Sequence, residues 1–578
     1  MRCRAFLVGV LLIVSAGAIA QSRPASSEPL PDDLTRLINY VPDDSHLVLV
    51  IPSLVRLIEG VSRFGQAAGI DPLAELTAER ILRKPLGNHN GAVDINGPFA
   101  LAISAQHPEL LLIGLVTSID AWQGAAKPAH LPNDALLFEL GNRGYLATSA
   151  DGVALIARER STLERALRSS GTFRTQFAQH AAARLTGRQA LLWADVAAWR
   201  TAIKRQLQVI AQSAQLGLAA AGPDAEASQR IWTWLFAQLD RLADEAESYS
   251  VAAQIGADGV LLQDCTTFRA GSRIRDYLAA LRTPPRDLLR GLPADPAALV
   301  FAAEWEVPAE LETIDEKLVR VMLGPEKQRE TAAGARCETA LRESVAAHRT
   351  MTGYNGLIAW SEAEREFLYG GVYFSQSGDT LRKHVRGIYE ACPELMSSWG
   401  VLSASGPVYT TENIAGAEAD VYRFTVAGTD GRADPLMQAL YGEQSVLCMA
   451  AHPDGVAYAL SSQTGAHTAL TRLLAQDGPR LSTDARVGPL FKVLSPHPQG
   501  CVVIDVPRTL NLFGSMLRSV GLSCPSLSVE HFGNMPLAGA TFYLEPQRIR
   551  SELYVPSAPV RALIETFGYK RSDSKSGQ

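Results

Sequence analysis

The feature that most constrains the fold is a sequence unit that occurs twice in the chain. Residues 40–61, YVPDDSHLVLVIPSLVRLIEGV, combine a turn, a short apolar run suited to a buried strand, and apolar residues at helical spacing. Residues 291–314, GLPADPAALVFAAEWEVPAELETI, repeat this pattern, and Pro293 stands 251 residues after Pro42. In the first copy, Ser53 is expected to cap the helix that follows it.

Later signals recur in the same order. YLATSADGVALIA at 145–157 matches VLCMAAHPDGVAYAL at 446–460, and both contain Asp-Gly between two β-rich arms. Asp-Gly at such a position is a strong hairpin signal, because glycine adopts the positive φ of the turn without steric cost. The sequence STLE at 161–164 is expected to start a helix as a capping box. The apolar strand that ends at Asp195 matches the strand that ends at Asp505.

Constant order with a changing offset indicates duplication followed by loop insertion. We predict an α+β fold of two homologous tandem domains, each an antiparallel sheet with helices packed on one face. The domains are expected at residues 35–283 and 284–567, because consecutive prolines interrupt regular structure in LRTPPRDLLRG at 281–291. Residues 568–578 are expected to form a disordered tail.

The repeated residues also carry a family resemblance. They are an opening strand preceded by Pro and Asp (Pro42 and Asp44, then Pro293 and Asp295), the Asp-Gly segment with the helical stretch after it, and an apolar strand ending in Asp-Val. In these features the chain resembles a family of secreted bacterial proteins of unknown function with a duplicated α+β domain. The resemblance spans most of the mature chain and implies the fold. The family has no established activity or site residues to carry over.

The N-terminus has the layout of a secretory signal peptide. MRCRAFLVGVLLIVSAGAIA, residues 1–20, has a basic start, an apolar run and small residues ending in Ala-Ile-Ala. The alternative is an uncleaved membrane anchor, for which the apolar run is short compared with the roughly 20 residues that span a bilayer. We therefore expect cleavage near Ala20, a flexible leader at 21–34, no transmembrane segment in the mature chain, and an extracytoplasmic location in the periplasm or outside the cell.

The charge of the chain argues against nucleic-acid binding. The formal net charge of −6 becomes −8 when Arg2 and Arg4 leave with the signal peptide. A nucleic-acid-binding protein is expected to carry a basic surplus or a basic stripe, and neither is present. The composition, with 47% hydrophobic residues, is that of a chain with ample material for packed cores.

Six cysteines remain after removal of the signal peptide, which permits up to three disulfides in an oxidising compartment. They are Cys265, Cys337, Cys392, Cys448, Cys501 and Cys524. Free buried thiols are the alternative, since Cys448 and Cys501 lie in strand-like runs. Cys337 with Cys392 is the favoured pair, because it would close a loop of roughly 55 residues in the expanded part of the second half and contribute about 4 kcal/mol. Cys448 with Cys501 is the competing pair.

No catalytic motif is present. The sequence contains no G-x-S-x-G, H-E-x-x-H, P-loop, dinucleotide fingerprint or C-x-x-C, so we predict no catalytic residues, no metal ligands and no cofactor. Asp195 and Asp505 end equivalent strands, where catalytic carboxylates occur in many folds. Capping of the following helix is the preferred interpretation, because an Asp at that position can accept from free backbone N–H groups.

One loop concentrates polar residues that bind metals or sugars. GNHNGAVDINGP at 87–98 contains His89 and Asp94, and is the weak candidate for a functional loop. Turn formation explains the same composition, since Asn, Asp and Gly favour turns.

Two functions remain after these exclusions. The favoured one is a non-enzymatic extracytoplasmic binding or scaffold protein with an envelope ligand or a protein partner. The alternative is a hydrolase that acts on an envelope polymer or peptide in a cleft between the two halves, with acids or His89 as the reacting groups. A site can assemble from distant residues without a motif, so both hypotheses stay open from the sequence.

Overall fold

The computed structural model describes residues 31–86, 93–104, 106, 109–117, 129–219, 226–281, 287–294, 297–306, 321, 332–361, 366–391, 408–424, 444–475, 477–519 and 535–567. The chain forms two compact units, each assembled from separate stretches of sequence. The N-unit comprises Ser22–Ile203, Ala243–Ser272 and Gln547–Gln578, and the C-unit comprises Met1–Gln21, Lys204–Leu242 and Arg273–Pro546. Among the described helices, none is long and apolar enough to cross a membrane.

The N-unit is built on an antiparallel sheet in the strand order β20-β10-β9-β8-β1-β2-β3-β7-β6-β5-β4. The strands are β1 (Leu47–Ile51), β2 (Phe99–Ile103), β3 (Leu110–Leu115), β4 (Ala129–His130), β5 (Leu136–Glu139), β6 (Tyr145–Thr148), β7 (Val153–Ala157), β8 (Ala190–Asp195), β9 (Ala246–Gly256), β10 (Gly259–Phe268) and β20 (Arg548–Pro556). The last strand of the chain thus belongs to the same unit as the first.

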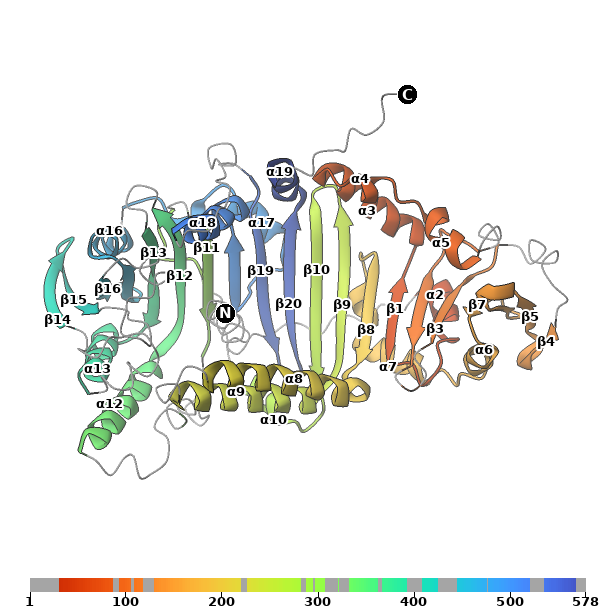
Figure 1. Ribbon diagram of the computed structural model, residues 1–578, viewed down its shortest axis with the longest axis horizontal. Coiled ribbons are helices and arrows are strands. Elements are labelled where there is room, and N and C mark those ends of the chain that lie inside the picture. Colours follow the sequence, from red (N-terminus) through yellow and green to blue (C-terminus); the bar gives the residue numbers. More distant parts are fainter. Residues whose placement is uncertain are drawn as a thin grey trace. The chain divides into compact units, whose positions relative to one another are not determined.

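The helices of the N-unit are α2 (Asp32–Ile38), α3 (Leu54–Ala68), α4 (Asp71–Ala74), α5 (Ala78–Leu86), α6 (Arg160–Leu167), α7 (Thr172–His180) and α19 (Ser557–Phe567). The short 3-10 helices are η3 (Pro132–Asp134), η4 (Gly141–Arg143) and η5 (Ala182–Leu185). Figure 1 shows α19 beside α3 at the end of the sheet where β9 turns into β10.

The C-unit contains an antiparallel sheet in the order β19-β18-β11-β12-β13-β17-β16-β15-β14. Its strands are β11 (Leu299–Glu304), β12 (Met351–Ser361), β13 (Glu366–Ser375), β14 (Val408–Ile414), β15 (Ala417–Phe424), β16 (Ser445–His452), β17 (Gly455–Ser461), β18 (Gly500–Ile504) and β19 (Ala538–Glu545). Its helical segments are α10 (Arg273–Ala280), α12 (Ala332–His348), α13 (Gly378–Ala391), α16 (Gln463–Leu474), η8 (Leu481–Thr483), α17 (Val487–Val493) and α18 (Val506–Ser519). The hairpin of α8 (Val196–Ala219) and α9 (Glu226–Glu245) has residues in both units.

Nine strands of each unit follow the same order. In the N-unit, β9-β8-β1-β2-β3-β7-β6-β5-β4 corresponds strand for strand to β19-β18-β11-β12-β13-β17-β16-β15-β14 of the C-unit. Asp151-Gly152 connects β6 to β7, and Asp454-Gly455 connects the equivalent strands β16 and β17. The sequence predicted an antiparallel hairpin at each Asp-Gly, and both hairpins are present.

Helices cover both faces of the N-unit sheet, so the prediction of helices on one face is wrong. α2, α6 and α7 pack on one face over a core that includes Val48, Leu191 and Trp193. α3 and α5 pack on the other face over Ile51 and Phe99. The physical reason is in the strands themselves: β1 and β2 are apolar at nearly every position, which is typical of strands buried on both sides.

The aspartates of the two Asp-Gly turns hold the segment that enters the first strand of each unit. The Tyr40 hydroxyl donates to Asp151 Oδ1 at 2.6 Å, and Arg290 Nε lies 3.6 Å from Asp454 Oδ1. Next to the second contact, His452 has a side chain that is 2% exposed, and its Nδ1 accepts from the Asp454 N–H at 3.1 Å. Each turn therefore fastens residues more than 100 positions away in sequence.

Burial of His452 predicts a loss of stability in acid. Desolvation lowers the pKa of His452 below the usual value. The charge of Asp454 raises this pKa, and the charge of Arg480 lowers it further. Because the folded-state pKa lies below the unfolded one, this contribution to stability is present above about pH 6.5 and is lost as the pH falls through the folded-state pKa. Urea unfolding at pH 7 and pH 5 should show a smaller drop in His452→Asn, whose amide oxygen can still accept from Asp454. An unchanged drop would contradict the assignment.

Candidate functional site

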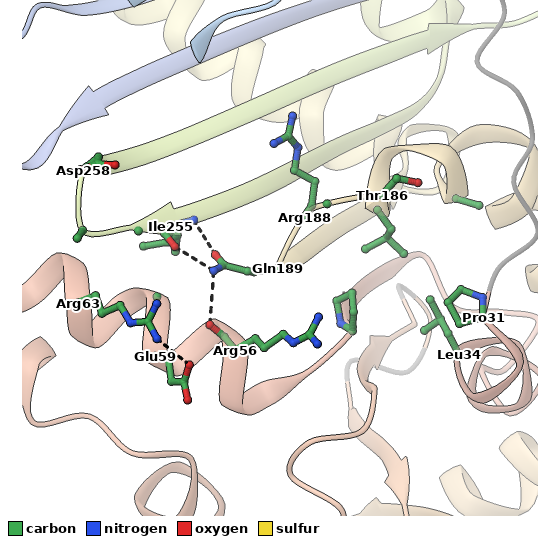
Figure 2. Close-up of a pocket in the computed structure, with 17 residues that line it drawn as sticks. Pro31, Leu34, Arg56, Glu59, Arg63, Thr186, Arg188, Gln189, Ile255 and Asp258 are labelled. Atoms are coloured by element: carbon green, nitrogen blue, oxygen red, sulfur yellow. Dashed lines mark hydrogen bonds and ion pairs between the residues drawn. The ribbon is translucent and has the colours of Figure 1, made fainter. Parts of the chain in front are cut away.

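The site is a groove of about 750 Å³ in the N-unit, at the end of the sheet where β9 turns into β10. Four segments line it: Pro31 and Leu34 at the start of α2, residues of α3 from Arg56 to Arg63 with the preceding Pro52, residues 182–189 leading into β8, and the turn at 255–258. Figure 2 shows that these segments surround the groove although they are far apart in sequence.

The floor of the groove is fixed by Gln189, the residue before β8. Its Nε2 donates to the carbonyls of Ile255 at 2.9 Å and Arg56 at 3.5 Å, and its Oε1 accepts from the Ile255 N–H at 2.6 Å. Gly60 permits this approach of α3 to β9, since a Cβ there would lie 2.5 Å from the Ile255 oxygen. One amide and one glycine thus set the position of α3 and of the arginines that it carries.

Three arginines line the groove, and they differ in their partners. Arg63 is exposed and pairs with Glu59 at 3.2 Å. Arg188 donates through Nε to Gln263 Oε1 at 3.1 Å and through Nη1 to a second glutamine oxygen, so its described hydrogen bonds are to neutral groups. Arg56 has no ion pair with any carboxylate in the part of the chain that is described. Against these three cations the lining has two carboxylates, Glu59 and Asp258.

A fourth arginine adds positive charge behind the groove. Arg184 donates to the carbonyl of Ser250 at 3.0 Å and to the carbonyl of Gln263, whose side chain receives Arg188. Burial lowers the pKa of both arginines, yet a guanidinium remains protonated at neutral pH. Within the described residues Arg184 forms no salt bridge, so its charge is balanced only by neutral acceptors and more distant acids. An anion in the groove would face an excess of positive charge.

The groove is chemically divided along its length. Figure 2 shows Pro31 and Leu34 at one end and Glu59, Arg63 and Asp258 at the other. The Arg56 side chain extends along the groove from α3. Apart from these groups the lining is mostly glycine and apolar residues, and it contains no His, Cys or Ser. The groove therefore offers cationic and apolar contacts together with two carboxylates, Glu59 and Asp258.

The described part of the predicted functional loop, residues 93–98, is not in the lining of this groove. His89 lies outside the described residues. Asp94 is described, and its Oδ1 accepts from the Asn96 N–H at 2.9 Å while its own N–H donates to Leu115 at 2.8 Å. These bonds belong to a turn over residues 94–97, which Asp, Asn and Gly favour. The described residues contain no cluster of three or more His, Cys, Asp or Glu side chains suited to a metal ion.

The strand-end aspartates are caps. Asp195 Oδ1 accepts from the N–H groups of Ala197 at 2.9 Å and Ala198 at 3.3 Å, at the start of α8. Asp505 Oδ1 accepts from the Arg508 N–H at 3.2 Å, at the start of α18, and its other oxygen pairs with Arg486 at 2.8 Å. The preferred interpretation of both residues from the sequence is confirmed.

The cysteines divide into free and bonded thiols. Cys265, Cys448 and Cys501 are buried and form no disulfide, which excludes the competing pair Cys448 with Cys501. Cys337, on α12, is disulfide-bonded. Cys392 lies outside the described residues, so the pair Cys337 with Cys392 stays a prediction.

Sequence reasoning missed the groove. Its cations come from α3 and from the segment before β8, more than 120 residues apart, and no spacing rule connects them. The one available signal was on α3, where Arg56, Glu59 and Arg63 follow at helical spacing and give the helix a charged stripe.

Comparisons with known proteins add no name. No protein-family profile matches the chain, and no characterised protein matches it. Three chains among the solved structures match. One is crystal form I of TP0453, with 10% sequence identity, coverage of 40% of this chain and 78% of that chain, and a TM-score of 0.21. A similarity at this level transfers neither fold nor function.

Proposed function

We propose that the chain is a non-enzymatic extracytoplasmic binding protein whose N-unit groove holds an anionic ligand. The observation that carries this proposal is the charge of the groove: Arg56 and Arg188 line it, and neither forms an ion pair with a carboxylate among the described residues. Arginine recognises carboxylate and phosphate through paired N–H donors, and it suits planar anions better than lysine does. The positions of α3 and Gln189 hold the groove open before any ligand arrives.

The location outside the cytoplasm rests on the first 20 residues and their signal-peptide layout. The resemblance to secreted bacterial proteins agrees with it. A hydrolase is the alternative. In this groove its reacting groups would have to be the carboxylates Glu59 and Asp258, and Glu59 is already paired with Arg63 at 3.2 Å.

We also infer that the two units arose by duplication of one α+β domain. The support is the order of nine strands shared by both units, with equivalent Asp-Gly hairpins and equivalent strand-end aspartates that cap the next helix. The repeats predicted from the sequence meet at residues 283 and 284, but β20, near the end of the second repeat, belongs to the N-unit. The boundaries of the repeats and of the compact units therefore differ. The groove has contacts from α3, from the segment before β8 and from the end of β9.

Calorimetric titration with inorganic phosphate and with acetate, at low ionic strength, tests the binding proposal. Each charge-assisted hydrogen bond contributes about 1.5 to 3 kcal/mol, so Arg56→Gln with Arg188→Gln should weaken binding at least tenfold. Arg168→Gln is the matched control, because that side chain, in the residue just after α6, is 67% exposed and lies outside the groove lining. Its affinity should stay within about twofold of the unmodified chain. Equal binding by the double variant, or no binding of either anion, would refute the proposal.

A further inference from the structure

We infer that the ligand of this groove is an acidic amphiphile, a carboxylate or phosphate carried on an apolar group. This inference rests on the proposed function, since it assigns the anionic end of the ligand to the same arginines. It adds an apolar subsite at the α2 end of the groove, formed by Pro31, Leu34, Pro52 and Leu185.

The separation of charge within the groove is the first step. Figure 2 places Pro31 and Leu34 at one end, whereas Glu59, Arg63 and Asp258 lie together at the other. The far end disfavours an anion, because Arg63 already pairs with Glu59 at 3.2 Å and Asp258 adds a second carboxylate. The unpaired cation that remains within reach of the apolar end is Arg56, whose side chain extends along the groove from α3. A ligand that uses both features carries its anionic group next to an apolar group.

The rigidity of the apolar end is the second step. Leu34 and Leu185 are 3% and 7% exposed and belong to the dry core between α2, η5 and the sheet. Pro31 precedes α2 and Pro52 precedes α3, and a proline ring presents apolar surface with no backbone N–H to satisfy. Leu34 and Leu185 therefore form a fixed base, and the apolar surface that a ligand can cover at this end belongs to Pro31, which is exposed, and to Pro52, which is half-buried.

The size of the groove is the third step. Its volume of about 750 Å³ is within the range of sites that enclose most of a small organic ligand, and exceeds what an inorganic anion needs. A small hydrophilic anion would occupy the neighbourhood of Arg56 and leave the Pro31 end wet. An amphiphile fills both ends, which is why we assign this ligand class.

Titration with acetate and octanoate separates the inference from the function on which it rests. The two probes share a carboxylate and differ only in apolar length, so octanoate should bind at least tenfold more tightly. Arg56→Gln should weaken both probes. Pro31→Ser, at an exposed position before α2, should lower the octanoate-to-acetate ratio of affinities by at least threefold and leave acetate binding unchanged.

The outcomes are distinct. Equal affinity for both probes, with Arg56 still required, overturns the amphiphile and leaves the anion-binding function standing. Octanoate binding that is unaffected by Arg56→Gln overturns both claims, as does the absence of binding of either probe. A third experiment uses vesicles of phosphatidylglycerol in phosphatidylcholine. If the protein sediments with these vesicles, needs Arg56 to do so and does not bind free octanoate, the ligand is a lipid surface and the proposal of a soluble amphiphile is overturned.

Discussion

Glu304→Gln is expected to lower the free energy of unfolding of the C-unit by about 3 to 5 kcal/mol. The Glu304 side chain is fully buried at the end of β11 and accepts two hydrogen bonds from Arg290, at 2.9 and 3.0 Å. The Arg290 guanidinium also lies 3.4 Å from the centre of the Phe374 ring. The glutamine keeps the shape of the side chain but removes its charge. The mostly buried guanidinium then keeps only the more distant and partly exposed Asp454, 3.6 Å from its Nε, as a counter-charge. Urea unfolding followed by circular dichroism measures the change.

The matched control is Glu565→Gln, in which the same substitution removes an exposed ion pair. Arg561 and Glu565 lie 2.8 Å apart on α19, and both side chains are more than half exposed. Exposed pairs at this spacing contribute about 0.3 to 0.5 kcal/mol, so this variant should unfold close to the unmodified chain. Comparable losses in the two variants would mean that burial does not decide the strength of the Arg290 pair.

Local signals in the sequence predicted the elements where one short segment decides the outcome. Ser53 is the N-cap of α3, and its Oγ accepts from the Arg56 N–H at 3.3 Å, as expected from its position before an apolar helical stripe. The Asp-Gly hairpins are present for the same reason, since the turn depends on two adjacent residues. The capping box at Ser161 is wrong: α6 begins at Arg160, and Ser161 Oγ donates to Glu159 at 3.4 Å, so the helix starts one residue before the proposed cap.

The groove could not be predicted in this way, because no short segment contains it. Gln189 reaches Ile255 only because β8 pairs with β9 in a register that places Ala190 opposite Ala253. Arg56 reaches the same place because Gly60 lets α3 lie against the end of β9. These relations depend on long-range pairing, and the side chains involved have ordinary surface composition. The prediction that helices cover one face of the sheet was wrong for a related reason. Alternation of apolar and polar residues identifies a strand that is buried on one side, whereas a continuous apolar strand is typical of burial on both sides.

Asp420→Asn is expected to destabilise the C-unit by about 3 kcal/mol or more. Asp420, on β15, has a side chain with no exposed surface, and it accepts from Arg382 Nε at 2.9 Å, from Arg386 Nη2 and from the Tyr409 hydroxyl at 2.9 Å. Two cations one turn apart on α13 therefore share one buried carboxylate. The substitution leaves both guanidinium groups without their buried counter-charge, and urea unfolding measures the loss.

Asp379→Asn is the control that isolates burial from charge, because Asp379 also pairs with Arg382. That pair is 3.6 Å long, and the Asp379 side chain is 89% exposed, so water screens the interaction and its loss should cost less than about 1 kcal/mol. The two variants make the same chemical change beside the same arginine. If their free energies of unfolding fall by similar amounts, the charge of Arg382 is compensated by solvent and not by Asp420. A large loss confined to Asp420→Asn means that α13 is held to β14 and β15 through this carboxylate.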